Sequence, residues 1–279
     1  MSAMLRFGPA GMPLDCKGKR LPDGILYVFN EGLRAFEVEF VRGVRIREED
    51  AVEAAKIARQ KNIRLSCHGP YWVNCCSPLK IKQQITIRNI MQTARAAQIL
   101  GAKIMVFHPG YYQKQPKEKA FENALNLLKG IENKMKEEKL QCFIGLETSG
   151  KKAGFGTLDE IIELCKKIRK ARPVIDFAHL HAITNGGIKN EQDYESIINK
   201  IKKELGSEYL KEMHCHFTEI VYTEKGERYH IPIGTSNSPP FRPLAKLIAE
   251  KNYKFTIISE SPLLDKDALK MQEIVRKSR

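Results

Sequence analysis

The feature that most constrains the fold is a regular alternation along the chain between short apolar segments and longer charged ones. Eight short segments rich in Val, Ile and Phe are typical of buried strands. They begin at Met4 (MLRFG), Phe36 (FEVEFV), Ile63 (IRLSC), Lys103 (KIMVF), Gln141 (QCFIGL), Pro173 (PVIDF), Glu212 (EMHCHF) and Lys254 (KFTIIS). The sequence therefore predicts eight strands.

Most of these strands are separated by stretches that have helical spacing and many Lys and Glu. The predicted helices are Glu48–Asn62, Leu79–Leu100, Lys117–Lys139, Leu158–Ala171, Glu191–Leu205 and Pro243–Lys251, with a helical turn around Ile25–Leu33. Such alternation favours a parallel sheet wrapped by helices, closed as a barrel or open and doubly wound. Eight strands favour closure, so we expect an α/β fold, a (β/α)8 TIM barrel, as a single domain over residues 1–279.

The charge and cysteine content bound the partners and the compartment. Lys and Arg number 47 against 33 Asp and Glu, a formal charge of +14 that attracts polyanions, nucleic acid foremost. The alternative is a solvated basic surface with no partner. Seven cysteines without a CxxC pair indicate neither disulfides nor a zinc knuckle, so we expect a reducing, cytoplasmic compartment and, from the apolar segments, a soluble protein. We see no signal peptide, membrane span or obligatory protein partner.

The seven histidines all lie at or just beyond the C-terminal end of a predicted strand. They are His68, His108, His179, His181, His214, His216 and His230. In a barrel these strand ends converge on the catalytic face. As a set they favour a metal site, whereas for His181 alone we prefer an ordinary hydrogen-bonded histidine.

Three carboxylates occupy matching positions after apolar runs, namely Glu147, Asp176 and Glu260. An ionised group in a barrel mouth is costly unless it is paired or binds a cation. Mixed imidazole and carboxylate donors suit zinc, manganese or ferrous iron. A pair of such ions can activate water and orient a phosphodiester without a protein nucleophile.

Seven motifs carry a resemblance to a known family. They are SCHGPYWVN from Ser66, VFHPG from Val106, GLETSG from Gly145, DFAH from Asp176, MHCHF from Met213, HIPIG from His230 and SESP from Ser259. In order and spacing they resemble the metal-site motifs of endonuclease IV, zinc-dependent TIM-barrel enzymes that incise DNA on the 5′ side of abasic sites. The resemblance runs from about Ser66 to Pro262 and implies double-stranded DNA containing abasic sites as the substrate.

The resemblance implies two or three Zn²⁺ ions, with Mn²⁺ or Fe²⁺ as alternatives. It implies that His68 and His108 hold a first ion and that Glu147 bridges it to a second. Asp176 and His214 would join Glu147 on that second ion.

Glu260 would complete the second ion and polarise the attacking water, which makes Glu260 and Glu147 the implied catalytic carboxylates. His214 and His216 both point into the mouth, because residues two apart share a face of a strand. Alignment through Met213 favours His214 as the ligand and leaves His216 as a substrate contact or an alternative metal ligand.

His179 and His230 are the implied ligands of a third ion. The family uses an Asp-x-His pair there, but the residue two before His230 is Arg228. Glu227 could replace the aspartate if Tyr229 is accommodated as an extra residue. The ion count is therefore two or three.

The segment after His68 matches the place where the family inserts side chains into the DNA duplex. Here the residues are Tyr71 and Trp72, and exposed aromatics suit filling a base gap by stacking. Arg42 is a candidate phosphate contact. The alternatives are that Trp72 packs on the barrel rim and that Arg42 is a solvated loop arginine. The family's first-strand histidine motif is absent, with RFGPAG in its place.

Two other functions compete with a nuclease. Sugar isomerases and epimerases similar to xylose isomerase use related barrels with one or two divalent ions, but they generally need fewer histidines. A non-enzymatic nucleic-acid-binding barrel would leave the carboxylates on the binding face repelling phosphates.

Overall fold

The strands form a ring of parallel neighbours in a computed structural model that describes residues 4–279. Around the ring the order is β1 (Arg6–Pro9), β12 (Thr256–Ser259), β9 (His214–Phe217), β8 (Ala171–Asp176), β6 (Phe143–Glu147), β4 (Ile104–Phe107), β3 (Arg64–His68) and β2 (Ala35–Glu39). The ring closes between β1 and β2. Just beyond β1, the N–H of Gly11 donates to Glu37 O of β2 at 2.9 Å, and Ala10 forms a parallel bridge with Glu37. The predicted TIM barrel and all eight of its strands are confirmed.

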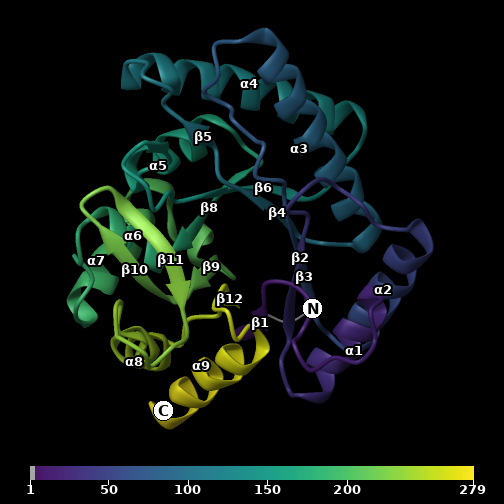
Figure 1. Cartoon of the computed structure of the whole chain (residues 1–279), viewed down its shortest axis with the longest axis vertical. Helices are drawn as coiled ribbons and strands as arrows, with labels where there is room; N and C mark the ends of the chain where they lie inside the picture. Colours follow the sequence, from purple (N-terminus) through teal and green to yellow (C-terminus); the bar gives the residue numbers. More distant parts are fainter. Residues whose placement is uncertain (1–3) are drawn as a thin grey trace.

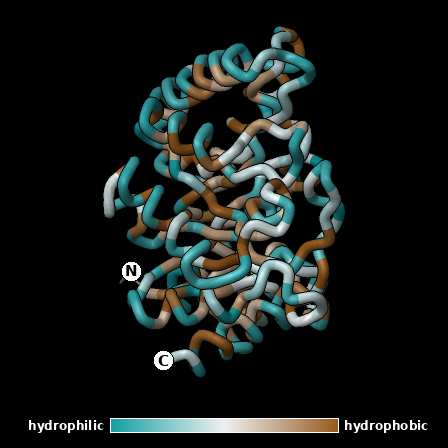
Figure 2. Tube along the Cα trace, turned by 90° about the vertical axis from the view of Figure 1, so that its left-hand side faces the viewer, coloured by the Kyte–Doolittle hydropathy of each residue, from teal (hydrophilic) through white to brown (hydrophobic). Residues whose placement is uncertain are grey.

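Helices surround this ring (Figure 1). They are α1 (Leu21–Asn30), α2 (Glu48–Gln60), α3 (Lys80–Leu100), α4 (Lys117–Glu137), α5 (Leu158–Lys167), α6 (Phe177–Ile183), α7 (Glu191–Leu205), α8 (Phe241–Lys251) and α9 (Asp265–Lys277). Hydrophilic and hydrophobic residues alternate along them, because one face packs on the barrel (Figure 2). The predicted helices are confirmed, although α5 ends at Lys167 because Ile168 is already extended. We did not predict α6 and α9. No helix among the described residues is long and apolar enough to cross a membrane.

Two small antiparallel pairs, also unpredicted, arise from loops that follow barrel strands. The pair β10 (Glu219–Thr223) and β11 (Gly226–Ile231) follows β9, and β5 (Gly110–Tyr111) pairs with β7 (Gly154–Phe155) after β4 and β6. These loops leave the C-terminal ends of the strands, so they build walls around the mouth of the barrel.

The barrel interior is apolar on one side and polar on the other. Phe143, Ile104, Val106 and Val174, from β4, β6 and β8, form an apolar cluster of their own. On the opposite side Glu37 of β2 contacts His214 of β9, two strands that are not neighbours, so both side chains point inward. TIM barrels usually fill this space with bulky branched residues. The polar half therefore requires a separate explanation.

A glycine on β1 is required for ring closure. A Cβ on Gly8 would lie 1.9 Å from the backbone oxygen of Ala35 on β2. We expect Gly8→Ala to lower the free energy of unfolding by about 3 kcal/mol or more, because the added methyl group would clash with backbone atoms of Ala35, which cannot rotate away as a side chain can. Gly130→Ala is the matched control, since a Cβ there has no neighbour within 4 Å in α4, and it should raise stability by ~0.5–1 kcal/mol. Urea titration measures both, and equal stability of Gly8→Ala and the parent contradicts the prediction.

Candidate metal centre

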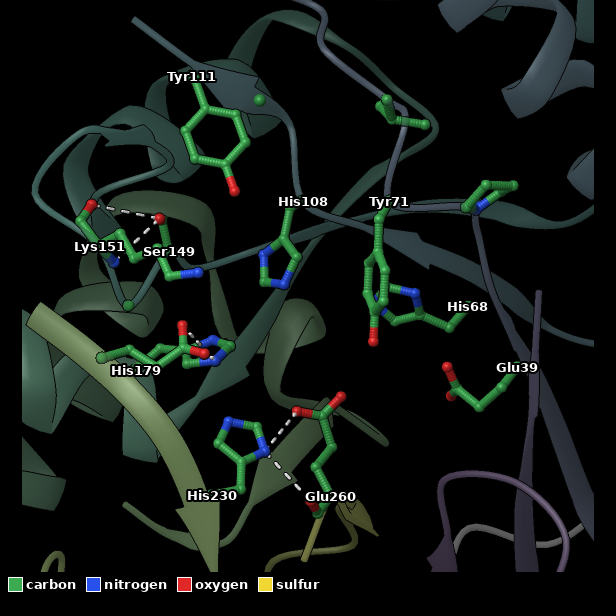
Figure 3. Close-up of a pocket in the computed structure, with 15 residues that line it drawn as sticks. Glu39, His68, Tyr71, His108, Tyr111, Ser149, Lys151, His179, His230 and Glu260 are labelled. Atoms are coloured by element: carbon green, nitrogen blue, oxygen red, sulfur yellow. Dashed lines mark hydrogen bonds and ion pairs between the residues drawn. The ribbon is translucent and has the colours of Figure 1, made fainter. Parts of the chain in front are cut away.

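The mouth of the barrel encloses a cavity of about 340 Å³ at the C-terminal ends of the strands. Its ionisable lining residues are Glu39, His68, Tyr71, His108, Tyr111, Lys151, His179, Glu227, His230 and Glu260. Figure 3 shows the labelled imidazoles and carboxylates facing one another across this space.

The ligand atoms gather in three adjoining groups, in each of which they lie within 4.8 Å of one another. The groups are His68, His108 and Glu147; then Glu147, Asp176, His216 and Glu260; then Asp176, His179, His230 and Glu260. Neighbouring groups share carboxylates. Shared carboxylates are the arrangement that two or three closely spaced cations need.

Backbone carbonyls fix the orientation of three of these imidazoles. The bonds are His68 Nδ1 to Gly69 O (2.9 Å), His179 Nδ1 to Thr148 O (3.0 Å) and His230 Nδ1 to Glu260 O (3.1 Å). An Nδ1–H that donates to a carbonyl leaves Nε2 with a free lone pair, as metal-binding histidines require.

Two buried atoms of the third group lack hydrogen-bond partners. They are Nε2 of His230 and Oδ2 of Asp176. The other oxygen of Asp176 caps α6 by accepting the N–H of His179 at 2.7 Å, which fixes both residues at the end of β8. Buried polar atoms without partners are costly, and a bound cation would satisfy both. The residues present thus fit a divalent metal.

A β-bulge resolves the expected mismatch in the third group. Val221 pairs with Tyr229 and Tyr222 pairs with Glu227, so Arg228 has no partner in the ladder. The extra residue is Arg228, where we expected Tyr229. Because of the bulge, Oε2 of Glu227 lies 3.5 Å from Nε2 of His179. Glu227 is therefore available as a further carboxylate at this group.

The second of the three groups, Glu147, Asp176, His216 and Glu260, is the central group. Its histidine is His216, whereas the alignment favoured His214. Nδ1 of His216 lies 3.1 Å from Oε1 of Glu147 and 3.1 Å from Oε1 of Glu260. In the parallel register of β9 and β12, His214 stands opposite Thr256 and His216 opposite Ile258. His214 is therefore two residues deeper in the barrel, and its Nε2 lies 2.9 Å from Glu37 Oε2.

Two acidic residues of β2 were missed from the sequence, namely Glu37 and Glu39. Glu37 is 0% exposed and contacts His214 and His216, while Glu39 lines the cavity. Burial raises the pKa of Glu39 to about 8. Their spacing in FEVEF, two acids on one face of a predicted strand, was the signal that could have identified them.

The candidate DNA contacts lie on two loops that a backbone hydrogen bond joins. Tyr71 and Trp72 are each 61% exposed, and Tyr71 lines the cavity. The backbone N–H of Tyr71 donates to Val41 O at 3.4 Å, next to the exposed Arg42. Trp72 is therefore not packed into the rim.

The carboxylates raise the pKa of some of the imidazoles when no cation is bound, whereas burial outweighs them at His108 and lowers its pKa to about 4. Burial by itself lowers the pKa of His68, but Glu39 and Glu147 outweigh it and raise the pKa to about 10. Burial likewise lowers the pKa of His179, which Asp176 and Glu147 raise to about 9. Burial raises the pKa of Glu260, but His216 outweighs it and lowers the pKa to about 2.

These shifts predict how pH affects the metal-free protein. The pKa values of His68 and His179 exceed the ordinary 6.5, so their charges stabilise the fold below that pH and are lost as pH rises through about 9 and about 10. From pH 7 to 10 we expect Tm to fall by at least about 2–4 °C, the shift for about 1 kcal/mol in a chain of this size. Zinc-loaded protein should keep its Tm. Calorimetry of both forms tests this, and a constant Tm for the metal-free form is the contrary result.

Two histidines on α6 offer a matched pair. His179 faces the centre, whereas His181 accepts the N–H of Ile188 at 3.3 Å and donates through Nε2 to Ser238 Oγ at 2.7 Å. We expect His179→Gln to lose about one equivalent of zinc, since a ligand is removed, and His181→Gln to retain all of it. Elemental analysis after desalting measures the content. Equal zinc in the two variants would exclude His179 as a ligand.

Comparison with known proteins gives the same fold and relatives at two levels of sequence identity. A family model described as xylose isomerase-like TIM barrel matches residues 27–277. An uncharacterized protein of Methanocaldococcus jannaschii is 34% identical over 95% of both chains. A "probable endonuclease 4" of Mycoplasma genitalium is 28% identical over 74% of this chain and 71% of its own.

Solved structures share the fold at low identity. Endonuclease IV from Thermus thermophilus has a TM-score of 0.73 at 15% identity, covering 97% of this chain and 100% of its own. A D-tagatose 3-epimerase-like protein has a TM-score of 0.71 at 20% identity, covering 93% of each chain. The structural likeness thus extends to both a nuclease and an epimerase, and it concerns the fold alone.

Proposed function

The chain belongs to the xylose isomerase-like TIM-barrel family, and from this premise we propose that it is a zinc-dependent phosphodiesterase that incises DNA on the 5′ side of abasic sites. The proposal rests on the motifs that resemble endonuclease IV and on relatives described as probable endonuclease 4. The basic charge of +14 suits a DNA substrate.

The observation that carries the proposal is the extension of the central group by histidines on both sides. Glu147, Asp176, His216 and Glu260 by themselves would suffice for one ion. His68 and His108 extend the group on one side, and His179 and His230 extend it on the other. An isomerase of a small sugar has no evident need of these four imidazoles, whereas a phosphodiester benefits from several cations around its oxygens.

Bound zinc would supply the positive charge that binds the phosphate and lowers the pKa of a water. The chain's own contribution centres on Glu260. Its carboxylate belongs to the central group and lines the cavity, where it could orient the attacking water and accept its proton. Water adds to phosphorus, the bond from phosphorus to the 3′ oxygen breaks, and that oxygen takes up a proton.

The rim residues would hold the damaged DNA over this centre. Tyr71 and Trp72 are exposed aromatics beside the cavity, suited to stacking in the gap left by a missing base. Arg42, exposed on the neighbouring loop, would contact a backbone phosphate.

Epimerisation of a ketose is the second candidate, because the central group alone matches a single divalent ion held by two Glu, one Asp and one His. The two functions differ in substrate size and in the number of ions required. Both can be assayed on one preparation of the protein.

The decisive experiment incubates zinc-loaded protein with an end-labelled duplex that carries one abasic site. We expect incision 5′ to the site, loss of incision on chelation, and a reduction by at least about 10²-fold in Glu260→Gln, because the proton acceptor is lost. Glu137→Gln is the control, since Glu137 is exposed at the end of α4, remote from the mouth. An intact duplex, with a ketose epimerised by the same preparation, overturns the proposal in favour of the second candidate.

A further inference from the structure

A fourth group of ionisable residues lies beneath the metal centre, inside the barrel. It consists of Glu37 on β2 with His214 and His216 on β9, and all three side chains are buried. Because β1 and β12 separate these strands in the sheet, the group spans the interior. This group accounts for much of the polar half of the barrel.

The contacts form a chain that leads up to the metal centre. Nε2 of His214 donates to Oε2 of Glu37 at 2.9 Å. The other oxygen of Glu37, Oε1, lies 2.8 Å from Nε2 of His216. The ring N–H is not aligned on that oxygen, so both atoms remain without a hydrogen bond.

His216 differs from three of the other candidate histidine ligands in what faces its second nitrogen. His68, His179 and His230 each donate to a backbone carbonyl. His216 lies within β9, where the ladder of the sheet occupies the backbone groups. A side chain must therefore orient its imidazole, and Glu37 is the side chain within reach.

We propose that Glu37 is a positioning residue: it accepts the Nε2–H of His216 and so directs Nδ1 of that imidazole at the metal, while His214 holds Glu37 in place. This inference rests on the proposed metal centre. A carboxylate behind a metal-binding imidazole fixes its tautomer and increases its basicity as a ligand. A buried carboxylate is otherwise costly in a barrel interior, so its presence here is explained by this role.

A cation held by the fourth group itself is the competing interpretation. Nδ1 of His216 already faces Glu147 and Glu260. A cation bound by Nε2 as well would require His216 to lose both ring protons.

The test compares zinc retention and the imidazole spectrum of the parent with those of Glu37→Gln. An amide keeps the shape but replaces one acceptor by a donor, so we expect zinc in the central group to bind about 10–100-fold more weakly in competition with a chelator. In the zinc-loaded, ¹⁵N-histidine-labelled parent we expect a strongly downfield Nε2–H proton of His216 that disappears in Glu37→Gln. Unchanged affinity, or no such proton in the parent, overturns the proposal.

Further variants separate positioning from a loss of fold. Glu219→Gln changes another buried carboxylate, which accepts backbone N–H groups of Gly234, Ser236 and Asn237, and should leave zinc affinity unchanged. His214→Leu should weaken zinc binding several-fold, and His214→Gln, which can still donate to Glu37, should restore it. The parent could instead bind one more zinc equivalent than the three groups of the metal centre hold. If His214→Leu loses that equivalent, the proposal is overturned in favour of a cation bound beneath the centre. None of these measurements uses DNA, so absence of incision leaves the inference standing.

Discussion

The carboxylate of Glu147 at the end of β6 is the constraint on which the rest of the site depends. It is 0% exposed and lies 3.1 Å from His68, 3.4 Å from His108, 3.1 Å from His216 and 3.5 Å from His179. A charge removed from water needs compensation, by protons on the imidazoles or by cations between them. Either way, five strands, β3, β4, β6, β8 and β9, must bring residues to one point, and a closed barrel accomplishes this.

The division of the barrel interior follows from that convergence. β4, β6 and β8 supply the apolar residues that pack its lower part, while β2 and β9 supply the polar chain of Glu37, His214 and His216. β6 and β8 also carry Glu147 and Asp176 at their C-terminal ends, so packing and the site use the same strands at different depths. Helices packed outside the ring supply most of the hydrophobic core, so the fold tolerates a polar interior.

A β-bulge and a helix cap place two side chains of the site that regular strands and helices would not bring together. The bulge at Arg228 turns Glu227 toward His179, and the cap that Asp176 makes on α6 brings His179 to the end of β8. Bulges and caps are short-range devices, yet each redirects a ligand toward the centre. Glu227 thus reaches the third group although the expected Asp-x-His pair is absent from this chain.

The sequence alone determined the eight strands, most helices and the clustering of histidines at strand ends, because periodicity and strand termini are local properties of the chain. It also predicted Glu147, Asp176 and Glu260 as candidate ligands, which the structure brings close to one another. Only the tertiary structure decided that His216 rather than His214 faces the centre, and that Glu37 lies behind it. Two residues that share one face of a strand are equivalent in sequence, and their depth is set by how β9 is staggered against β12 and β2 when the ring closes.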